Sequence, residues 1–346
     1  MRSALHNGDD AGRIIEELKN VIPDGYGLTV EENGDIGGAS IEAILEEVIG
    51  TFTGEIGPIS AFFMLAFGLA VLVGASRYLL ASRDDLLGKT AQVGVCTVAS
   101  VSLFSPLYAI CITVRDSLIT IIDFISSIIP VMTLVSCAEG AGESAATQAF
   151  GLNFTLMLLD KLAVKLLLPV SFSMFTLSFV SSFASGGISS VIKGMKNLYT
   201  WGIGIISAVL SAVLAMQGVV ASARDTALLR AARYAAGSMI PVVGNTVASA
   251  LSTLGGGLAL VKSSVGVSSV VVILITVLTP LLYLIAHRLA LSVAILFLEF
   301  AESEGGVRCF SAFRSALDAL LAVYSMSILV CIVEMVVFIK SGGGLV

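Results

Sequence analysis

Charged residues are scarce in this chain. Only 13% of its 346 residues are Asp, Glu, Lys or Arg, whereas 56% are hydrophobic and the mean hydropathy is +0.99. A typical soluble domain has about 25% charged residues, so this chain cannot cover a water-exposed surface. The shortage excludes an ordinary soluble enzyme and a disordered protein. It also excludes a nucleic-acid-binding protein, which needs clustered Lys and Arg. The composition predicts a polytopic membrane protein.

Residues that usually build catalytic or metal sites are also few. The two histidines, His6 and His287, have no Cys, Asp or Glu at metal-ligand spacing. No phosphate-binding loop, dinucleotide fingerprint or nucleophile–base arrangement occurs. Five cysteines lie in or beside apolar segments without a CxxC spacing, which favours buried thiols that pack as small hydrophobes: Cys96, Cys111, Cys137, Cys309 and Cys331. We therefore expect no enzyme, no cofactor and no metal ion.

The charges that are present divide the chain in two. Residues 1–57 hold 12 of the 25 acids and three of the 19 bases, a net charge of −9, and residues 58–346 carry +3. Amphipathic patterns at 14–22 and 41–52 predict short helices, with Ser40 as the N-cap of the second. Residues 1–18 contain acids and lack the apolar core of a secretory signal. We predict an acidic soluble N-terminal region over 1–57 and a transmembrane helical domain over 58–346.

The second part contains repeated apolar segments of membrane-spanning length. A helix needs about 20 mostly apolar residues to cross a bilayer. Seven segments meet this requirement. Five of them carry no charge, 58–76, 90–114, 166–192, 197–223 and 263–286, while 117–138 and 316–339 contain acids. The fold class predicted is all-α, a polytopic transmembrane helical bundle of about seven spans with a small acidic N-terminal helical region.

Three further segments are ambiguous and allow re-entrant structure. Segments 144–159 and 289–298 are short for a span. Segment 234–261 is uncharged but interrupted by Pro241, Gly244 and the glycines at 255–257. Non-helical backbone at membrane depth must be buried in protein or line a cavity, so a broken hairpin inside the bundle is expected there.

The basic residues in the connections between spans indicate how the chain is oriented in the membrane. Cytoplasmic loops carry an excess of Lys and Arg. With the acidic region outside, inner loops hold ten bases and outer loops six, the latter including Arg288, Arg308 and Arg314. The count favours an extracytoplasmic N-terminal region.

The predicted spans contain three acids, of which Asp318 lies at the start of 316–339 and the other two are candidate site residues. Asp123 is six residues into its segment, and Glu334 is near the end of the last one. Intramembrane acids are functional candidates, here for a proton or ion relay. The alternative, which we favour, is that they reach the interface or pair with Arg115 and Lys340. A small-residue face from Gly202 to Ser211 indicates close helix packing.

The most specific local pattern follows residue 216. It reads Q-G-x2-A-x3-D-x3-L-R-x-A-R-x6-I-P-V-x-G and then L-x-K-x2-V-G. Charges form a short turn or interfacial helix, and the proline then breaks regular helix. Its distinctive members are Gln217, Gly218, Asp225, Arg230, Arg233, Pro241, Gly244, Lys262 and Gly266.

This pattern resembles the stage III sporulation protein AE family. The similarity is densest over 217–266, and the order of apolar segments extends it through most of the chain. Two departures are the missing signal peptide and the glycines at 255–257, where the family carries larger residues. No catalytic residues are carried over from the family.

The resemblance implies a multi-pass protein of the mother-cell membrane around the forespore. It implies a subunit of the channel, or feeding-tube, complex that joins the two cells and is required for endospore development. Expected partners are membrane lipid and other stage III sporulation membrane subunits, not nucleic acid, and a homo-oligomer is left open. A stand-alone secondary transporter is the alternative, because interrupted helices suit that class too.

Overall fold

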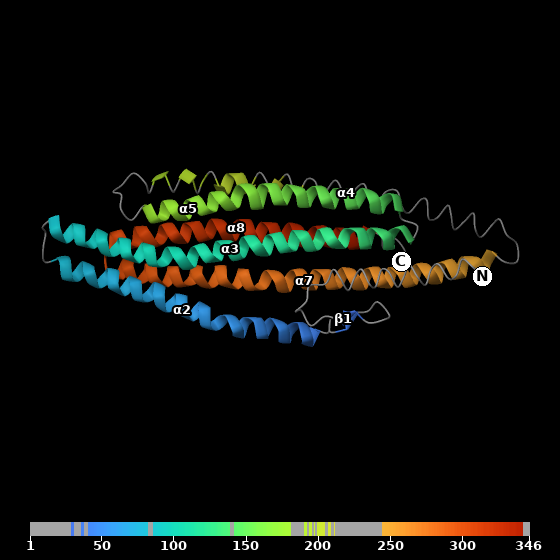
Figure 1. Cartoon of the computed structure of the whole chain (residues 1–346), viewed down its shortest axis with the longest axis horizontal. Coiled ribbons are helices and arrows are strands. Elements are labelled where there is room, and N and C mark those ends of the chain that lie inside the picture. The colour runs from blue at the N-terminus through green and yellow to red at the C-terminus, as the bar shows by residue number, and fades with distance from the viewer. Residues whose placement is uncertain are drawn as a thin grey trace.

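The protein is an elongated bundle of long helices that run along a common axis (Figure 1). The computed structural model describes residues 29–30, 36–37, 41–81, 86–138, 142–180 and 244–341, and short helical pieces between 190 and 211. The main helices are α2 (Ile41–Ala81), α3 (Leu86–Ala138), α4 (Gly142–Leu159), the π-helix η1 (Asp160–Leu167), α5 (Leu168–Val180), α7 (Gly244–Phe300) and α8 (Glu304–Ser341). In the described part of the chain, strands are limited to an antiparallel pair, β1 (Thr29–Val30) and β2 (Ile36–Gly37).

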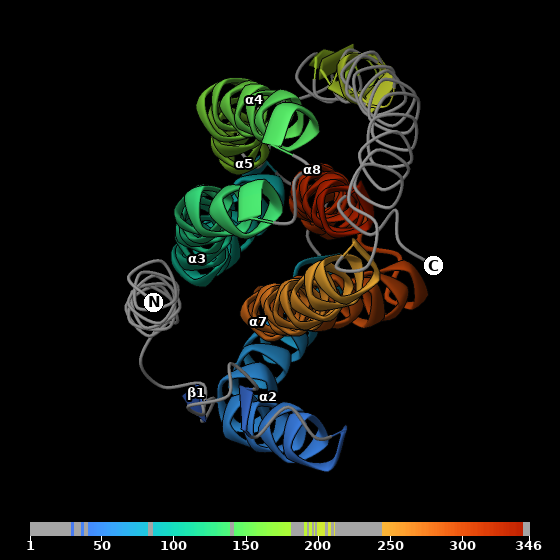
Figure 2. The ribbon, with the colours of Figure 1, turned by 90° about the vertical axis from the view of Figure 1, so that its right-hand side faces the viewer.

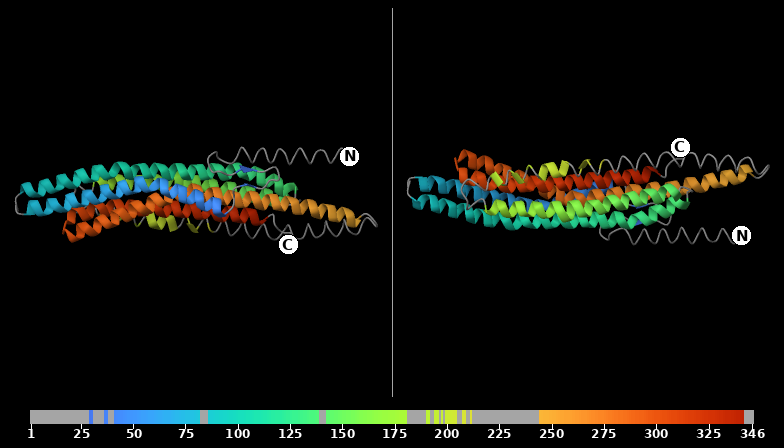
Figure 3. Two further views of the ribbon diagram at one scale, coloured as in Figure 1. Left: turned by 90° about the horizontal axis from the view of Figure 1, so that it is seen from below. Right: turned by 90° about the horizontal axis from the view of Figure 1, so that it is seen from above.

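Helix α8 is the centre of the bundle. Seen end-on, it lies between α7 and the α4–α5 pair, with α3 alongside, and α2 packs on α7 (Figure 2). Two side views show the same lengthwise alignment of the helices (Figure 3). The inward face of α8 carries large side chains that are fully buried, Phe310, Phe313 and Tyr324 among them. The core therefore follows the length of α8.

Four helices of the described residues are long and apolar enough to cross a membrane. The segments are Ile56–Leu79, Thr90–Leu134, Val272–Phe300 and Glu304–Val336. At 1.5 Å per residue, the 53 residues of α3 extend about 80 Å, whereas the hydrocarbon core of a bilayer is about 30 Å thick. The all-helical, apolar class is confirmed, and the longest helices reach well beyond one bilayer thickness.

Helix α3 joins two spans that the sequence predicted to be separate. Segments 90–114 and 117–138 form one continuous helix through Arg115 and Asp116. Both charged side chains are exposed, so the helix carries them on its surface without a turn. The sequence between the two segments contains no Gly or Pro that would end a helix. The expected loop between them is therefore wrong.

Helix α7 gives two further corrections. The glycines at 255–257 lie inside it, so the predicted break does not occur there, and residues 234–243 lie outside the described residues. A glycine costs about 1 kcal/mol in a helix, and the strong helix formers Leu254, Leu258 and Ala259 flank the triplet. Segments 263–286 and 289–298 also belong to this one helix.

These helices remove the basis of the ten-to-six loop count. Arg288 lies within α7, and Arg308 and Arg314 lie within α8, so none of the three is in a loop. A hydropathy segment ends at a charge, but a helix does not need to end there. The orientation of the N-terminal region therefore stays a prediction.

The remaining segments extend rather than interrupt the bundle. Segment 144–159 is not a separate re-entrant piece, because α4, η1 and α5 follow one another without a gap from 142 to 180. Helix α2 begins directly after Ser40 and continues into segment 58–76, so the predicted boundary at 57/58 lies inside a helix. The pattern at 14–22 is outside the described residues.

The small-residue face predicted from Gly202 to Ser211 is described only in part. A Cβ atom at Gly202 or Gly204 would have no neighbour within 4 Å, so close packing is not seen at these two positions.

The turn between α7 and α8 has the geometry of a Schellman motif. The backbone N–H of Ser303 donates to the carbonyl of Leu298, and that of Glu302 donates to the carbonyl of Glu299, both at 3.0 Å. Glu302 has φ 51°, the left-handed position at which helices usually place glycine. This non-glycine residue therefore carries backbone strain at the turn.

Replacing Glu302 by Gly should raise the free energy of unfolding by up to about 1 kcal/mol. Relief of left-handed strain outweighs the extra entropy of glycine in the unfolded chain. Glu302→Val should instead lower it by about 1–2 kcal/mol, because a β-branched side chain resists positive φ. Thermal unfolding in detergent measures both changes. Glu299→Val, at an exposed helical position three residues earlier, is the matched control, and a loss of stability in Glu302→Gly would contradict the prediction.

Candidate functional site

One face of α3 is polar although it belongs to a candidate span. Asp116, Thr120, Asp123, Ser126 and Ser127 recur at helical spacing and are all exposed. Three hydroxyl groups donate to carbonyls of their own helix: Thr120 to Asp116 at 2.9 Å, and Ser126 to Ile122 and Ser127 to Asp123 at 2.8 Å. The backbone thus satisfies the hydroxyl donors, and the two carboxylates give this face its charge. We call these five residues the α3 polar face.

The two predicted intramembrane acids do not lie in the same environment. Asp123 is exposed on the α3 polar face, whereas Glu334 is 1% exposed in the core around α8. A side chain buried in this way does not reach the interface, so the snorkelling interpretation does not fit Glu334. Among the described residues no group of three His, Cys, Asp or Glu side chains could hold a metal ion.

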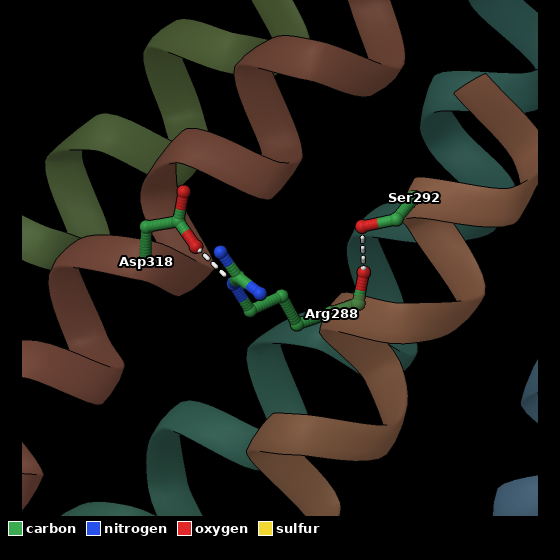
Figure 4. Close-up of polar contacts among 3 residues, drawn as sticks. All are labelled: Arg288, Ser292 and Asp318. Atoms are coloured by element: carbon green, nitrogen blue, oxygen red, sulfur yellow. Dashed lines mark hydrogen bonds and ion pairs between the residues drawn. The ribbon is translucent and has the colours of Figure 1, made fainter. Parts of the chain in front are cut away.

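An ion pair joins α7 and α8 where both are candidate spans. Nε of Arg288 donates to Oδ1 of Asp318 at 2.5 Å (Figure 4). The carbonyl of Arg288 also accepts a hydrogen bond from the Ser292 hydroxyl at 2.7 Å. The side chains are 38% and 25% exposed, so the pair is partly withdrawn from its surroundings. A charge is costly at membrane depth unless it is paired, and here each helix supplies the partner of the other.

The π-helix η1 carries a second ion pair. Nζ of Lys165 lies 2.6 Å from Oδ2 of Asp160, five residues earlier in the chain. The wider π-turn, with its i to i+5 hydrogen bonds, suits this spacing. The lysine side chain is 66% exposed, so this pair lies on the surface of the bundle. Single π-turns often occur at functional sites, and here the π-turns bring two opposite charges of η1 together.

Two buried tyrosines tie the helices together. The Tyr324 hydroxyl lies 2.8 Å from the Ser117 hydroxyl and donates to the carbonyl of Val277 at 3.3 Å. Ser117 also donates to the carbonyl of Thr276 at 3.3 Å. That carbonyl loses its normal partner because Pro280, four residues later, has no N–H. Side chains from α3 and α8 thus satisfy backbone groups at the proline of α7.

The second tyrosine makes an equivalent connection at another level. The Tyr199 hydroxyl donates to the carbonyl of Ala319 and lies within hydrogen-bond distance of the Ser171 hydroxyl, both at 2.9 Å. Tyr199 is 5% exposed, and its three-way contact links its own helical piece to α5 and α8. Both tyrosine ties use α8, in agreement with its central place.

The residues of the distinctive sequence pattern lie mostly outside this description. Gln217, Gly218, Asp225, Arg230, Arg233 and Pro241 are outside the described residues. Gly244 is the first residue of α7, and Lys262 and Gly266 follow on the same helix. Their roles therefore stay predictions.

Comparison with known proteins decides the family. The profile of the family described as Stage III sporulation protein AE (spore_III_AE) matches residues 31–342. The chain belongs to the stage III sporulation protein AE family. Stage III sporulation protein AE of Bacillus subtilis (strain 168) is 21% identical over 228 residues, which cover 66% of this chain and 57% of that protein. No solved structure matches the chain.

Membership in the stage III sporulation protein AE family confirms the resemblance read from residues 217–266 and identifies a sporulation protein. It is a sporulation family and not a known enzyme family. The four apolar helices fit a membrane location.

Sequence reasoning missed the Arg288–Asp318 pair in this family member. The loop count places Arg288 in a loop and hydropathy places Asp318 at the start of the span 316–339, so the sequence does not predict their contact. The available signal was symmetry, since each residue lies 15 positions from Ser303 in the α7–α8 turn. Two residues equally far from a helical hairpin turn lie at the same level of the hairpin.

Proposed function

We propose that the protein is a multi-pass membrane subunit of the channel complex that joins the mother cell and the forespore. In this proposal it lies in the mother-cell membrane around the forespore, with its N-terminal region extracytoplasmic. It acts without catalysis, together with other stage III sporulation membrane subunits, in contact with lipid and not with nucleic acid. Family membership and the apolar helices support the setting.

The observation that carries the proposal is the α3 polar face. Placing an Asp in the middle of a lipid-facing helix costs about 2.5–3.5 kcal/mol on insertion scales. The α3 polar face presents two acids and three hydroxyl groups outward from a candidate span. Such a surface is stable against water or against a polar surface of another subunit. A subunit of a channel complex meets this requirement, either along its passage or at its contacts.

Loss of the gene should arrest forespore development after engulfment in the endospore-forming organism that carries it. The complex is required at that stage in this proposal, so the yield of heat-resistant spores falls and the wild-type gene restores it. Affinity purification from detergent extracts of sporulating cells should recover other stage III membrane subunits. A normal spore yield contradicts the proposal, and purification of the protein alone favours the stand-alone transporter.

A double substitution tests the α3 polar face itself. Asp123→Leu with Ser126→Leu should weaken the contact made by this face at least tenfold, a change of about 1.4 kcal/mol in binding free energy, and the spore yield should fall. The variant is more apolar than the wild type, so failure to insert does not explain a loss. Ser105→Leu is the matched control, because this exposed serine lies on the same helix outside the α3 polar face. Full function of the double variant, with normal amounts in the membrane, would contradict a role for this face.

A further inference from the structure

A groove runs between α2, α3 and α7 near the middle of the bundle. It has a volume of about 520 Å³, within the usual range of small-molecule sites. Its walls include Pro58 and Phe62 from α2, Pro106 and Ile110 from α3, and His287 from α7. All of these residues fall within the candidate spans Ile56–Leu79, Thr90–Leu134 and Val272–Phe300.

The prolines account for the groove. A proline inside a helix removes a backbone hydrogen bond, and its ring bends the helix. Pro58 and Pro106 lie in neighbouring helices and both line the groove. Helix α2 runs beside α7 near its C-terminal end and diverges from it toward its N-terminal end (Figure 1). A helix that contains a proline packs less closely on its neighbours than a straight, ridge-packed helix, which favours a space at this level of the bundle.

The lining is apolar apart from a few groups, of which His287 is the most informative. Its ring is 4% exposed and packs on Phe62 with 3.9 Å between ring centroids. Nδ1 lies 2.7 Å from the carbonyl of Tyr283. Because a carbonyl can only accept, Nδ1 carries the proton, and Nε2 of the neutral ring is left as an acceptor. That is the one hydrogen bond of this ring among the described residues. The groove is therefore lined by apolar side chains and by a histidine whose Nε2 can accept a hydrogen bond.

The surroundings limit what can enter. Exposed apolar side chains adjoin lining residues in the sequence: Ile112 precedes Thr113, and Ile285 lies between Tyr283 and His287, both 40% exposed. One turn of a helix 10 Å across occupies about 420 Å³, so the groove would hold little more than a single turn of a partner helix. The other polar side chains of the lining are Thr113 and Tyr283. A slender apolar chain that carries a hydrogen-bond donor matches both the shape and the chemistry.

We propose that the groove binds a membrane lipid that has an apolar chain and a free hydroxyl group, of the mono- or diacylglycerol class. The chain lies along Phe62 and Ile110, and the hydroxyl donates to Nε2 of His287. This inference rests on the membrane location in the proposed function. It does not depend on the channel complex.

Photolabelling of the full chain in phosphatidylglycerol vesicles tests this site. Two tracers carry the same diazirine-bearing acyl chain, one as a monoacylglycerol and one as a methyl ester without a hydroxyl. Mass spectrometry then locates the label on α7 at three residues: His287 in the groove, Leu289, which is 55% exposed, and Leu284, which is fully buried. We expect label at His287 well above Leu284, and more of it from the monoacylglycerol than from the ester.

Three variants make the result specific. Ala61→Phe and Ala109→Phe fill the groove from opposite walls and should reduce the label at His287 to the level of Leu284. Ala75→Phe, at an exposed alanine of α2 away from the groove, should leave it unchanged. His287→Phe keeps an aromatic ring but removes the acceptor, so both tracers should then label Ile110 equally.

Each other result counts against the proposal. Label at His287 no higher than at Leu284, or equal labelling by the two tracers in the wild type, overturns it while Leu289 still reports lipid contact. If Leu289 is also unlabelled, the helix does not face lipid, and the proposed membrane location fails together with the groove.

Discussion

Replacing Asp318 by Ala should lower the free energy of unfolding by about 2–3 kcal/mol. The substitution leaves the Arg288 guanidinium without the carboxylate that it contacts at 2.5 Å. Loss of a hydrogen bond to a charged group costs about 1.5–3 kcal/mol, and a charge left among apolar helices adds to this cost. Thermal or denaturant unfolding in detergent, followed by circular dichroism, measures the change.

The surface pair of η1 is the matched control. Asp160→Ala removes a carboxylate from Lys165, whose side chain is 66% exposed, so we expect a loss of at most about 1 kcal/mol. Equal effects of Asp318→Ala and Asp160→Ala would contradict the structural role of the interhelical pair.

A double variant separates the pair from its single charges. Arg288→Leu with Asp318→Leu should recover most of the stability lost in Asp318→Ala, because apolar residues can replace even a fully buried ion pair at little cost and this pair is only partly buried. The single variants Arg288→Leu and Asp318→Leu complete the comparison. If the double variant is less stable than each of them, the two charges do not act as a pair.

The sequence predicted the class of the fold from its apolar segments but not the joints between them. Hydropathy treats Arg115 and Asp116 as the end of a span, yet both extend from the surface of a continuous helix. The same difficulty applies to Arg288 in α7. A charge limits a membrane segment only if it must face lipid, and a sequence alone does not say which way each side chain faces.

The candidate sites were harder to predict from the sequence than the helices were. Asp123 was identified from the sequence because an acid within an apolar segment is unusual, and its exposed position gives that observation a physical meaning. The Tyr324–Ser117 tie and the His287 groove depend on contacts between residues more than 150 positions apart. No local pattern encodes such contacts. The family pattern at 217–266 identified the protein without revealing any of these sites.

Replacing Gly306 by Ala should lower the free energy of unfolding by about 1–3 kcal/mol, the usual cost of overpacking a core. A Cβ atom at this position would lie 2.8 Å from Cγ1 of Val73, 2.9 Å from Cδ2 of Leu298 and 3.1 Å from Oγ of Ser303. Favourable carbon–carbon contacts begin near 3.5 Å. The three neighbours are themselves at most 1% exposed, so none can move away without disturbing further contacts. Thermal unfolding in detergent measures the loss.

Gly305 provides a control at the adjacent position of the same helix. Its Cβ atom would meet only Sγ of Cys96, at an ordinary 3.7 Å. Both substitutions replace a glycine in the first turn of the same helix and gain similar helix propensity, so the difference between Gly305→Ala and Gly306→Ala reports packing. We expect Gly305→Ala to be neutral or stabilising, and Val73→Ala to restore part of the stability of Gly306→Ala. Equal stability of the two glycine variants would mean that the α7–α8 turn does not pack against α2 as closely as the structure shows.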